Sequence, residues 1–252
     1  GLGDVYKRQV KDCPFNCSPY DPSNMCPRCS EKYKNEEKLP TEEREMVVVD
    51  LPLGATEDRV IGSLDIEKAI KYGIEALEPG ILAEANQNIL YVDEVNLLPD
   101  HIADDLLDSA ATGWNIVERE GISVSHPSRF IFIGTMNPEE GELRPQLLDR
   151  FPLSISVERI DSVKDRIKIV KRNMEFEADP EKFYEECKPL QEELQDKIAK
   201  ARNKLKEVVI PENLLESISK ACLDLKVDGL RPDIVITKAA IALAAFEERE
   251  EV

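Results

Sequence analysis

The stretch Ile89-Leu90-Tyr91-Val92-Asp93-Glu94 carries the strongest structural signal in this sequence. Its first four residues form a continuous apolar run of strand length, which is typical of a parallel strand buried on both faces. Two carboxylates follow immediately, at the carboxyl end of the strand, where ligands bind in open α/β sheets. A strand that simply ends in an acidic loop would give the same short pattern, so the neighbouring segments have to distinguish the two interpretations.

The two carboxylates suit a phosphoryl-transfer site. Side chains of consecutive residues at a strand end point in different directions, so Asp93 and Glu94 can hold separate roles. We expect Asp93 to position Mg²⁺ through a water molecule, and Glu94 to polarise the water that attacks a γ-phosphate.

Strand and helix signals alternate around this stretch. The expected elements are a strand at Met46–Val49, a helix at Asp65–Leu77, a helix at His101–Ala111, a hairpin around Gly121 and a second buried strand at Phe130–Ile133. Strands that alternate with helices predict an α/β layer with a parallel sheet. Beyond about residue 160 the strand signals stop, and amphipathic helices are expected at 190–205, 214–225 and 233–246.

Four segments follow from these patterns. Residues 1–9 show no apolar periodicity and are interpreted as a non-native leader outside the fold. Residues 10–45 are rich in cysteine and proline, and their prolines predict no regular helix or strand. Residues 46–160 form the α/β core, and residues 161–252 form a helical linker and an all-helical C-terminal domain.

Composition narrows the classes of partner. The net charge of −18 argues against a general nucleic-acid binder, because affinity for phosphate comes from clustered Lys and Arg. No apolar run approaches the roughly 18–20 residues that a membrane span requires, and no signal peptide is recognisable. We expect a cytoplasmic protein whose partners are proteins and small ligands.

Three further polar residues extend the candidate site. Asn137 follows the strand at Phe130–Ile133 and could hydrogen-bond the γ-phosphate or the attacking water, although Asn-Pro is by itself only a turn signal. Arg150 lies shortly after it and could neutralise charge in phosphoryl transfer, although most arginines are surface or structural residues. Arg231 opens a predicted helix and could reach the same phosphates.

Four of the six cysteines fall within a short segment, in the pattern Cys13-x3-Cys17-x8-Cys26-x2-Cys29. Four thiolates in a proline-rich segment suit tetrahedral Zn²⁺, and Cys-x2-Cys is a typical half-site. Iron–sulfur ligation has weaker support from the spacing, and reduced thiols or a redox-sensitive pair remain open alternatives. Neither His101 nor His126 sits at ligand spacing, so both are interpreted as structural residues.

Taken in order, these motifs resemble the AAA+ motor subunit of magnesium chelatase. The resemblance covers most of residues 10–251 and is densest over 47–152. It runs through Asp50–Arg59, Glu78–Asn86, Tyr91–Leu98 and Gly113–Gly121. It implies a partial AAA+ P-loop-type sheet with a β-hairpin insert at Trp114–Arg129, followed by a helical lid domain.

The resemblance also implies roles and partners. Asp93 and Glu94 would be Walker B, Asn137 sensor 1, Arg150 the arginine finger and Arg231 sensor 2, although Pro232 stands where the family commonly has a small residue. It implies ATP and Mg²⁺ as ligands and a homo-oligomeric ring, usually a hexamer. A second AAA+ chelatase subunit and a large porphyrin-binding subunit would complete the complex, with no nucleic acid and no membrane involved.

Two other functions fit parts of the pattern. One is a non-hydrolysing AAA+ interaction platform, against which the intact Asp93, Glu94, Asn137 and Arg150 argue. The other is a related ring ATPase that serves cobalt insertion, or a MoxR-like task. Our expectation is ATP hydrolysis that drives Mg²⁺ insertion into protoporphyrin.

The family's Walker A loop, Gly-x-x-x-x-Gly-Lys-[Ser/Thr], has no counterpart in residues 1–12. Its amides and lysine cradle the phosphates, so a chain without it is expected to be inactive alone. We therefore interpret the sequence as an N-terminally truncated piece, and predict that the gene encodes such a loop upstream of Val10. Sequencing the upstream region checks this, and an open reading frame without the loop would favour the platform instead.

Overall fold

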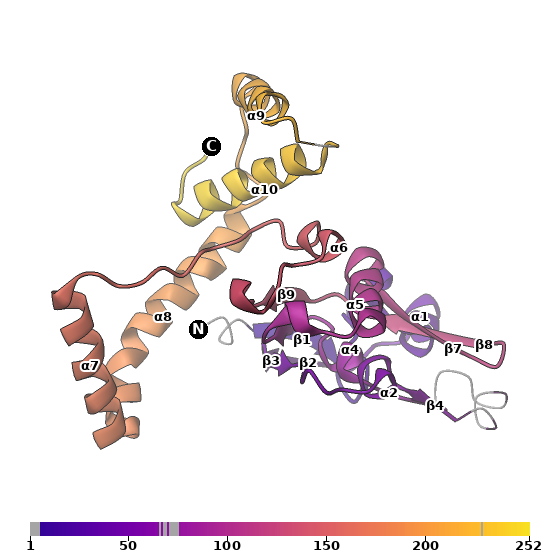
Figure 1. Cartoon of the computed structure of the whole chain (residues 1–252). Coiled ribbons are helices and arrows are strands. Elements are labelled where there is room, and N and C mark those ends of the chain that lie inside the picture. The colour runs from indigo at the N-terminus through magenta and orange to yellow at the C-terminus, as the bar shows by residue number, and fades with distance from the viewer. Residues whose placement is uncertain (1–5, 66, 68–69, 71–75, 228) are drawn as a thin grey trace. The chain divides into compact units, whose positions relative to one another are not determined.

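The computed structural model describes residues 6–65, 67, 70, 76–227 and 229–252. The chain divides into two units, one ending at Phe151 and the other beginning at Pro152 (Figure 1). The first unit contains the sheet and the second contains only helices and one isolated bridge among its described residues.

A three-stranded parallel sheet forms the centre of the first unit. Its strands are β3 (Val48–Asp50), β6 (Ile89–Val92) and β9 (Ile131–Gly134), in the order β3-β6-β9. The strand predicted at 89–92 is confirmed, whereas those predicted at 46–49 and 130–133 begin later by two residues and one residue. β6 lies between the other two strands, and its residue Leu90 is fully buried, as the apolar run predicted.

A helix and a hairpin follow β6 before the chain returns to the sheet at β9. The predicted helix at 101–111 is confirmed as α5 (Asp100–Thr112), which buries Ile102 and Leu106 and ends at Gly113 with a φ of 75°. The predicted hairpin is confirmed as β7 (Trp114–Arg119) and β8 (Ile122–Pro127), which pair antiparallel.

Two short helices, α2 (Glu57–Ile61) and α4 (Ile81–Glu84), lead from β3 towards β6. Between them β4 (Ser63–Leu64) pairs with β5 (Leu77–Glu78). The helix predicted at Asp65–Leu77 lies largely outside the described residues, and at Leu77 the prediction is wrong because that residue belongs to β5.

The N-terminal residues contain more regular structure than their prolines predicted. β1 (Tyr6–Val10) pairs antiparallel with β2 (Thr41–Glu45), so Tyr6–Gln9 take part in the fold. The 3-10 helix η2 (Pro22–Asn24) and the helix α1 (Pro27–Lys34) lie between these strands. The expectation of no helix or strand in 10–45 is wrong, because Pro27 occupies the first turn of α1, where its missing N–H costs nothing.

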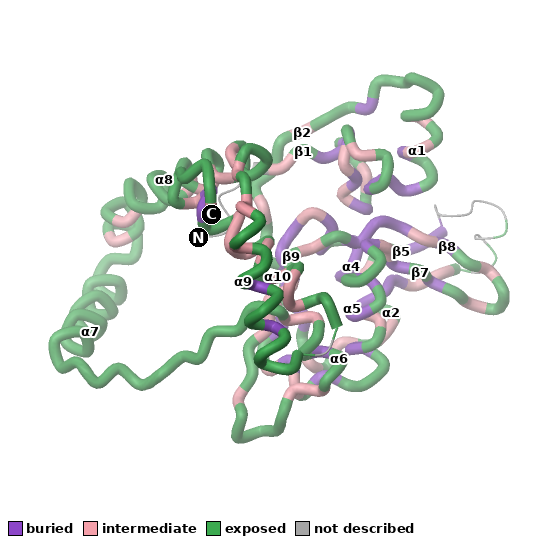
Figure 2. The backbone as a smooth tube through the Cα atoms, turned by 90° about the horizontal axis from the view of Figure 1, so that it is seen from above, coloured by how far each residue is buried: buried purple, intermediate pink, exposed green. Residues whose placement is uncertain are grey.

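The second unit consists of α7 (Val163–Ala178), α8 (Pro180–Lys204), α9 (Glu212–Asp224) and α10 (Arg231–Phe246). The helices predicted at 190–205, 214–225 and 233–246 correspond to α8, α9 and α10. Figure 2 shows α7 as exposed along its length, whereas α10 buries Ala244 and Ala245. Among the described helices, none combines the length and apolar character that crossing a bilayer requires.

Close backbone contact between the ends of α2 and α4 gives a prediction about stability. A Cβ atom on Gly80 would lie 2.5 Å from both the Gly62 nitrogen and the Val60 oxygen, whereas a Cβ on Gly54 would meet nothing within 4 Å. Gly80→Ala should therefore lower the free energy of unfolding by about 1–3 kcal/mol, because rigid backbone must move. Gly54→Ala is the control in denaturant unfolding, and equal midpoints for the two variants would contradict the close packing.

Candidate active site

Asp93 is an exposed residue that directly follows β6. Its Oδ1 atom accepts hydrogen bonds from the Tyr91 hydroxyl at 3.1 Å and from the Thr135 hydroxyl at 2.5 Å. One donor comes from its own strand and the other from the residue after β9. The two bonds therefore fix the orientation of this carboxylate at the edge of the sheet.

Thr135 is a site residue that sequence reasoning did not single out. Its hydroxyl donates to Asp93 and accepts from the backbone N–H of Glu94 at 3.0 Å. Its backbone N–H also donates to the Val92 carbonyl at 3.0 Å, and its carbonyl accepts from the Val95 N–H at 2.9 Å. A hydroxyl residue directly after β9 was the signal that could have identified it.

Glu94 has a left-handed backbone conformation, with a φ of 54°, before the 3-10 helix η4 (Val95–Leu97). This conformation is unfavourable for a residue with a Cβ atom and persists only where the surroundings enforce it, which is common at active sites. Thr135 enforces it here, because it binds the N–H groups of both Glu94 and Val95. Glu94 consequently follows Asp93 in a turn whose backbone is fixed.

Asn137 precedes the 3-10 helix η5 (Pro138–Glu140) and caps it. Its Oδ1 atom accepts a hydrogen bond from the Glu139 N–H at 3.1 Å. The cap fixes the side chain and occupies its acceptor, so that its NH₂ group is the part that can donate to a ligand.

The two arginines of the segment after η5 have different surroundings. Arg144, which precedes the short helix α6 (Pro145–Leu148), forms an ion pair with Asp100 at 2.6 Å and donates to the Leu98 carbonyl. Arg150 is half-buried, and no ion pair or side-chain hydrogen bond is found for it within the described part of the chain. Arg150 is therefore the arginine whose guanidinium is available to another molecule.

Phe151 attaches this arginine segment to the sheet. Its ring packs on the ring of Phe132 in β9, with centroids 4.6 Å apart. A Cβ atom on Gly134 would lie 3.1 Å from the Phe151 ring, so a small residue at the end of β9 makes room for this contact. Arg231 is the first residue of α10 in the second unit, and its sensor role stays a prediction.

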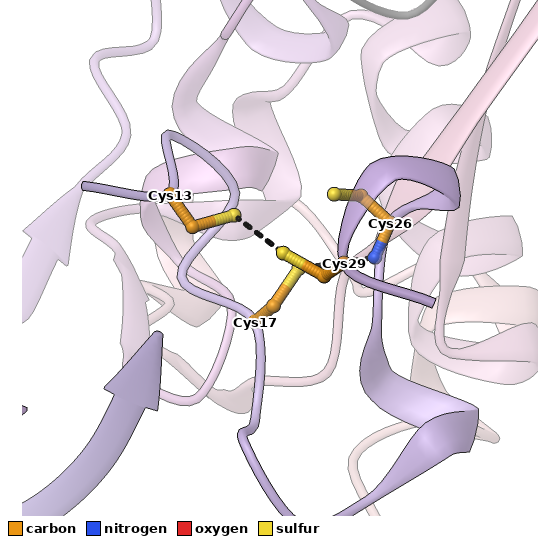
Figure 3. A group of neighbouring side chains, drawn as sticks. All are labelled: Cys13, Cys17, Cys26 and Cys29. Atoms are coloured by element: carbon orange, nitrogen blue, oxygen red, sulfur yellow. Dashed lines mark hydrogen bonds between the residues drawn. The ribbon is translucent and has the colours of Figure 1, made fainter. Parts of the chain in front are cut away.

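The four clustered cysteines, Cys13, Cys17, Cys26 and Cys29, lie together in the N-terminal part of the first unit (Figure 3). Their sulfur atoms all lie within 4.8 Å of one another, and all four thiols are free of disulfides. Cys17, Cys26 and Cys29 are buried, and Cys13 is half-buried. The structure thus brings together the four cysteines predicted as zinc ligands.

His126 is fully buried in β8 and serves the packing of this region. Its Nδ1 lies 3.0 Å from the Pro127 carbonyl and its Nε2 lies 2.9 Å from the Asn115 amide nitrogen, which assigns the proton to Nδ1. Burial lowers the pKa of His126, so the ring is neutral at neutral pH. Both ring nitrogens have partners, which fits a structural residue rather than a metal ligand.

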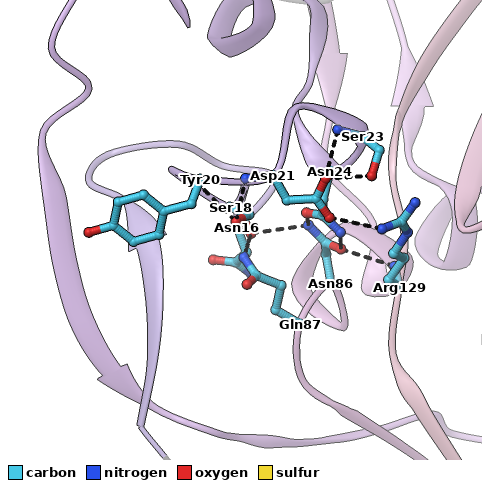
Figure 4. Close-up of polar contacts among 9 residues, drawn as sticks. All are labelled: Asn16, Ser18, Tyr20, Asp21, Ser23, Asn24, Asn86, Gln87 and Arg129. Atoms are coloured by element: carbon cyan, nitrogen blue, oxygen red, sulfur yellow. Dashed lines mark hydrogen bonds and ion pairs between the residues drawn. The ribbon is translucent and has the colours of Figure 1, made fainter. Parts of the chain in front are cut away.

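A polar network docks the cysteine-containing residues onto the core (Figure 4). Asn86, which is fully buried, exchanges side-chain hydrogen bonds with Asn24 at 3.1 and 3.0 Å. The Asn86 amide also donates to the carbonyls of Phe15 and Asn16, at 2.8 and 3.0 Å. Asn86 lies three residues before β6, so the contact reaches the amino end of the strand that Asp93 follows.

Comparisons with known proteins match both units. Residues 35–151 match the model of the AAA domain (dynein-related subfamily), and residues 215–252 match the model of the AAA lid domain. A solved structure of the complex between subunits BchI and BchD of magnesium chelatase aligns with a TM-score of 0.52 and 41% identity, over 96% of this chain and 73% of that chain.

Two curated relatives illustrate the similarity. The magnesium-chelatase subunit ChlI homolog of Methanocaldococcus jannaschii is 59% identical over 240 residues, which are 95% of this chain and 65% of that protein. The magnesium-chelatase subunit ChlI of Euglena gracilis is 54% identical over 243 residues, which are 96% of this chain and 70% of that protein. The chain thus spans about two thirds of their length, and by this similarity it belongs to the family of AAA+ magnesium-chelatase subunits.

Proposed function

We propose that this protein is the ATP-hydrolysing ring subunit of a magnesium-chelatase-type complex, in which hydrolysis drives insertion of Mg²⁺ into protoporphyrin. The observation that carries the proposal is the arrangement of Asp93, Thr135 and Glu94 at the ends of two neighbouring parallel strands. A merely acidic loop needs neither the fixed orientation of the Asp93 carboxylate nor the strained backbone of Glu94.

The Asp93 carboxylate suits the Mg²⁺ that accompanies ATP. Its Oδ1 atom receives two hydroxyl donors, and the side chain remains exposed, so that Oδ2 can accept from a metal-bound water. Mg²⁺ bound in this way supplies charge neutralisation on the phosphate oxygens. Thr135 holds Asp93 in one orientation. Hydrogen bonds of this kind commonly orient the carboxylates that bind a metal.

Glu94 is assigned as the residue that orients and deprotonates the attacking water. Its backbone is fixed by Thr135, and its carboxylate can accept a proton from a water near the γ-phosphate. Asn137 is assigned to donate its NH₂ group to that water or to the phosphate, because its oxygen is used in the η5 cap. Arg231 is assigned to the phosphates of the same nucleotide.

Arg150 is assigned to the nucleotide of the neighbouring subunit in a homo-oligomeric ring, with a hexamer as the expected size. Its unpaired guanidinium supports this role, in contrast to the ion pair that engages Arg144. The structure of BchI with BchD supports association with a second AAA+ subunit. We further propose that porphyrin binds on a large separate subunit.

Replacement of Glu94 by Gln tests the base. In the full-length protein, Glu94→Gln should lower kcat of ATP hydrolysis roughly 10²–10⁴-fold, because the amide cannot accept the proton. Affinity for ATP, measured by calorimetry, should stay nearly unchanged. Binding of ATP without measurable turnover by the unmodified protein would instead identify a non-hydrolysing platform.

Subunit mixing tests Arg150. Arg150→Ala should lower kcat roughly 10³-fold or more, whereas Arg159→Ala, which changes an exposed arginine, should have little effect. Mixing Glu94→Gln with Arg150→Ala subunits should restore part of the activity, since some interfaces then combine an intact Glu94 with an intact Arg150. Activity of the mixture equal to the average of the two variants would refute action across the interface.

Thr135 offers a test of how Asp93 is positioned. Thr135→Val removes the hydroxyl and keeps the shape, so it should raise the Mg²⁺ concentration needed for half-maximal ATPase activity roughly 10–100-fold. Thr135→Ser keeps both hydrogen bonds and should restore the normal Mg²⁺ dependence. If Val and Ser variants had the same Mg²⁺ dependence, Thr135 would have only a packing role.

A further inference from the structure

We propose that Cys13, Cys17, Cys26 and Cys29 bind one structural Zn²⁺ ion that holds residues 10–40, here called the cysteine segment, against the core. The proposal concerns a site separate from the nucleotide residues. Its success or failure is independent of the proposed ATPase function.

The spacing of the sulfur atoms fits a single tetrahedral ion. With Zn–S bonds of about 2.3 Å, the sulfurs of a tetrahedral site lie about 3.8 Å apart. The sulfurs of Cys13 and Cys29 are 3.7 Å apart, and all four lie within 4.8 Å of one another. A disulfide requires about 2.05 Å, and an iron–sulfur cluster places iron and sulfide between its cysteines and so separates them further.

The four ligands come from two local structures that the segment brings together. Cys13 and Cys17 lie in the loop after β1, and Cys26 and Cys29 lie at the start of α1. The Cys26 N–H donates to the Cys17 sulfur at 3.0 Å. An N–H group directed at a sulfur stabilises the negative charge of a ligating thiolate, as the outer contacts of metal sites do.

The surroundings of the four cysteines give a metal ion access to the sulfurs and offset the negative charge of the thiolates. A cavity of about 420 Å³ is lined by Cys13, Cys26 and Cys29, which gives an ion a route to the sulfurs. Four thiolates and one Zn²⁺ carry a net charge of −2. The same cavity is lined by Lys11, Arg28 and Lys32, whose positive charges outnumber the single negative charge of Asp12 and so offset the charge of the site.

The cysteine segment has few other means of holding its shape. Its buried apolar side chains apart from cysteine are few: Val10, Phe15, Pro19, Met25 and Leu39. Yet it must present Asn24 to Asn86, and Phe15 to His126, whose rings stack with centroids 4.9 Å apart. A metal cross-link between the loop and α1 supplies the rigidity that such a small core cannot.

Metal analysis of the purified full-length protein is the first test. We expect elemental mass spectrometry to show about one zinc per chain. The double variant Cys26→Ser/Cys29→Ser should lose that zinc. The matched control is Cys187→Ser/Cys222→Ser, which changes the two cysteines outside the cluster and should retain full zinc. Native protein that lacks metal, with all thiols open to titration, would overturn the proposal, and so would iron with stoichiometric sulfide.

A second measurement covers the case in which the double variant folds poorly. Zinc is withdrawn from the unmodified protein with a chelator under reducing conditions and replaced by Co²⁺, whose visible spectrum reports tetrahedral thiolate ligation. Limited proteolysis should then cut the metal-free protein first within residues 10–40, and Zn²⁺ should restore resistance. A cleavage pattern independent of zinc would overturn the structural role.

Discussion

The pairing of β6 with β9 is the interaction on which the candidate active site depends. Val92 pairs with Gly134, so Asp93 and Thr135 leave the sheet side by side, and one hydroxyl can reach both the Asp93 carboxylate and the Glu94 N–H. Parallel pairing at this register places the polar residues that follow both strands at the same edge of the sheet. A shift of this pairing by one residue would move Asp93 away from Thr135, so the hydrogen bonds of the Thr135 hydroxyl belong to this register.

The same two strands also position the arginine segment. Gly134 leaves room for the Phe151 ring, which packs on Phe132, and the backbone of Arg150 is thereby tied to β9 rather than to a free loop. Arg144 takes its partner from the start of α5, through Asp100. Packing therefore gives Arg144 a structural role and leaves Arg150 available. The sequence does not contain this distinction, because both arginines lie three residues from Leu147.

Sequence patterns predicted the elements whose signals are local. β6, α5 and the hairpin follow from apolar runs or periods within a dozen residues, and Asp93, Glu94 and Asn137 follow from their places after strands. Thr135 was missed because its importance arises from a contact between separate strands. The pairing of β1 with β2 was missed for a similar reason: Thr41–Glu45 is polar throughout, so no alternation marks it, and its partner lies some thirty residues away.

β6 connects the two sites that the first unit contains. At its amino end, Asn86 receives the cysteine segment, and Asn88 accepts from the Val47 N–H at 3.0 Å and from the Lys7 ammonium at 2.6 Å. At its carboxyl end stands Asp93. Four strand residues span only about 13 Å, and a buried strand of that length moves as one body. The contacts of the cysteine segment therefore help to fix the strand from which Asp93 projects, and the proposed zinc site would act on the candidate active site through that strand.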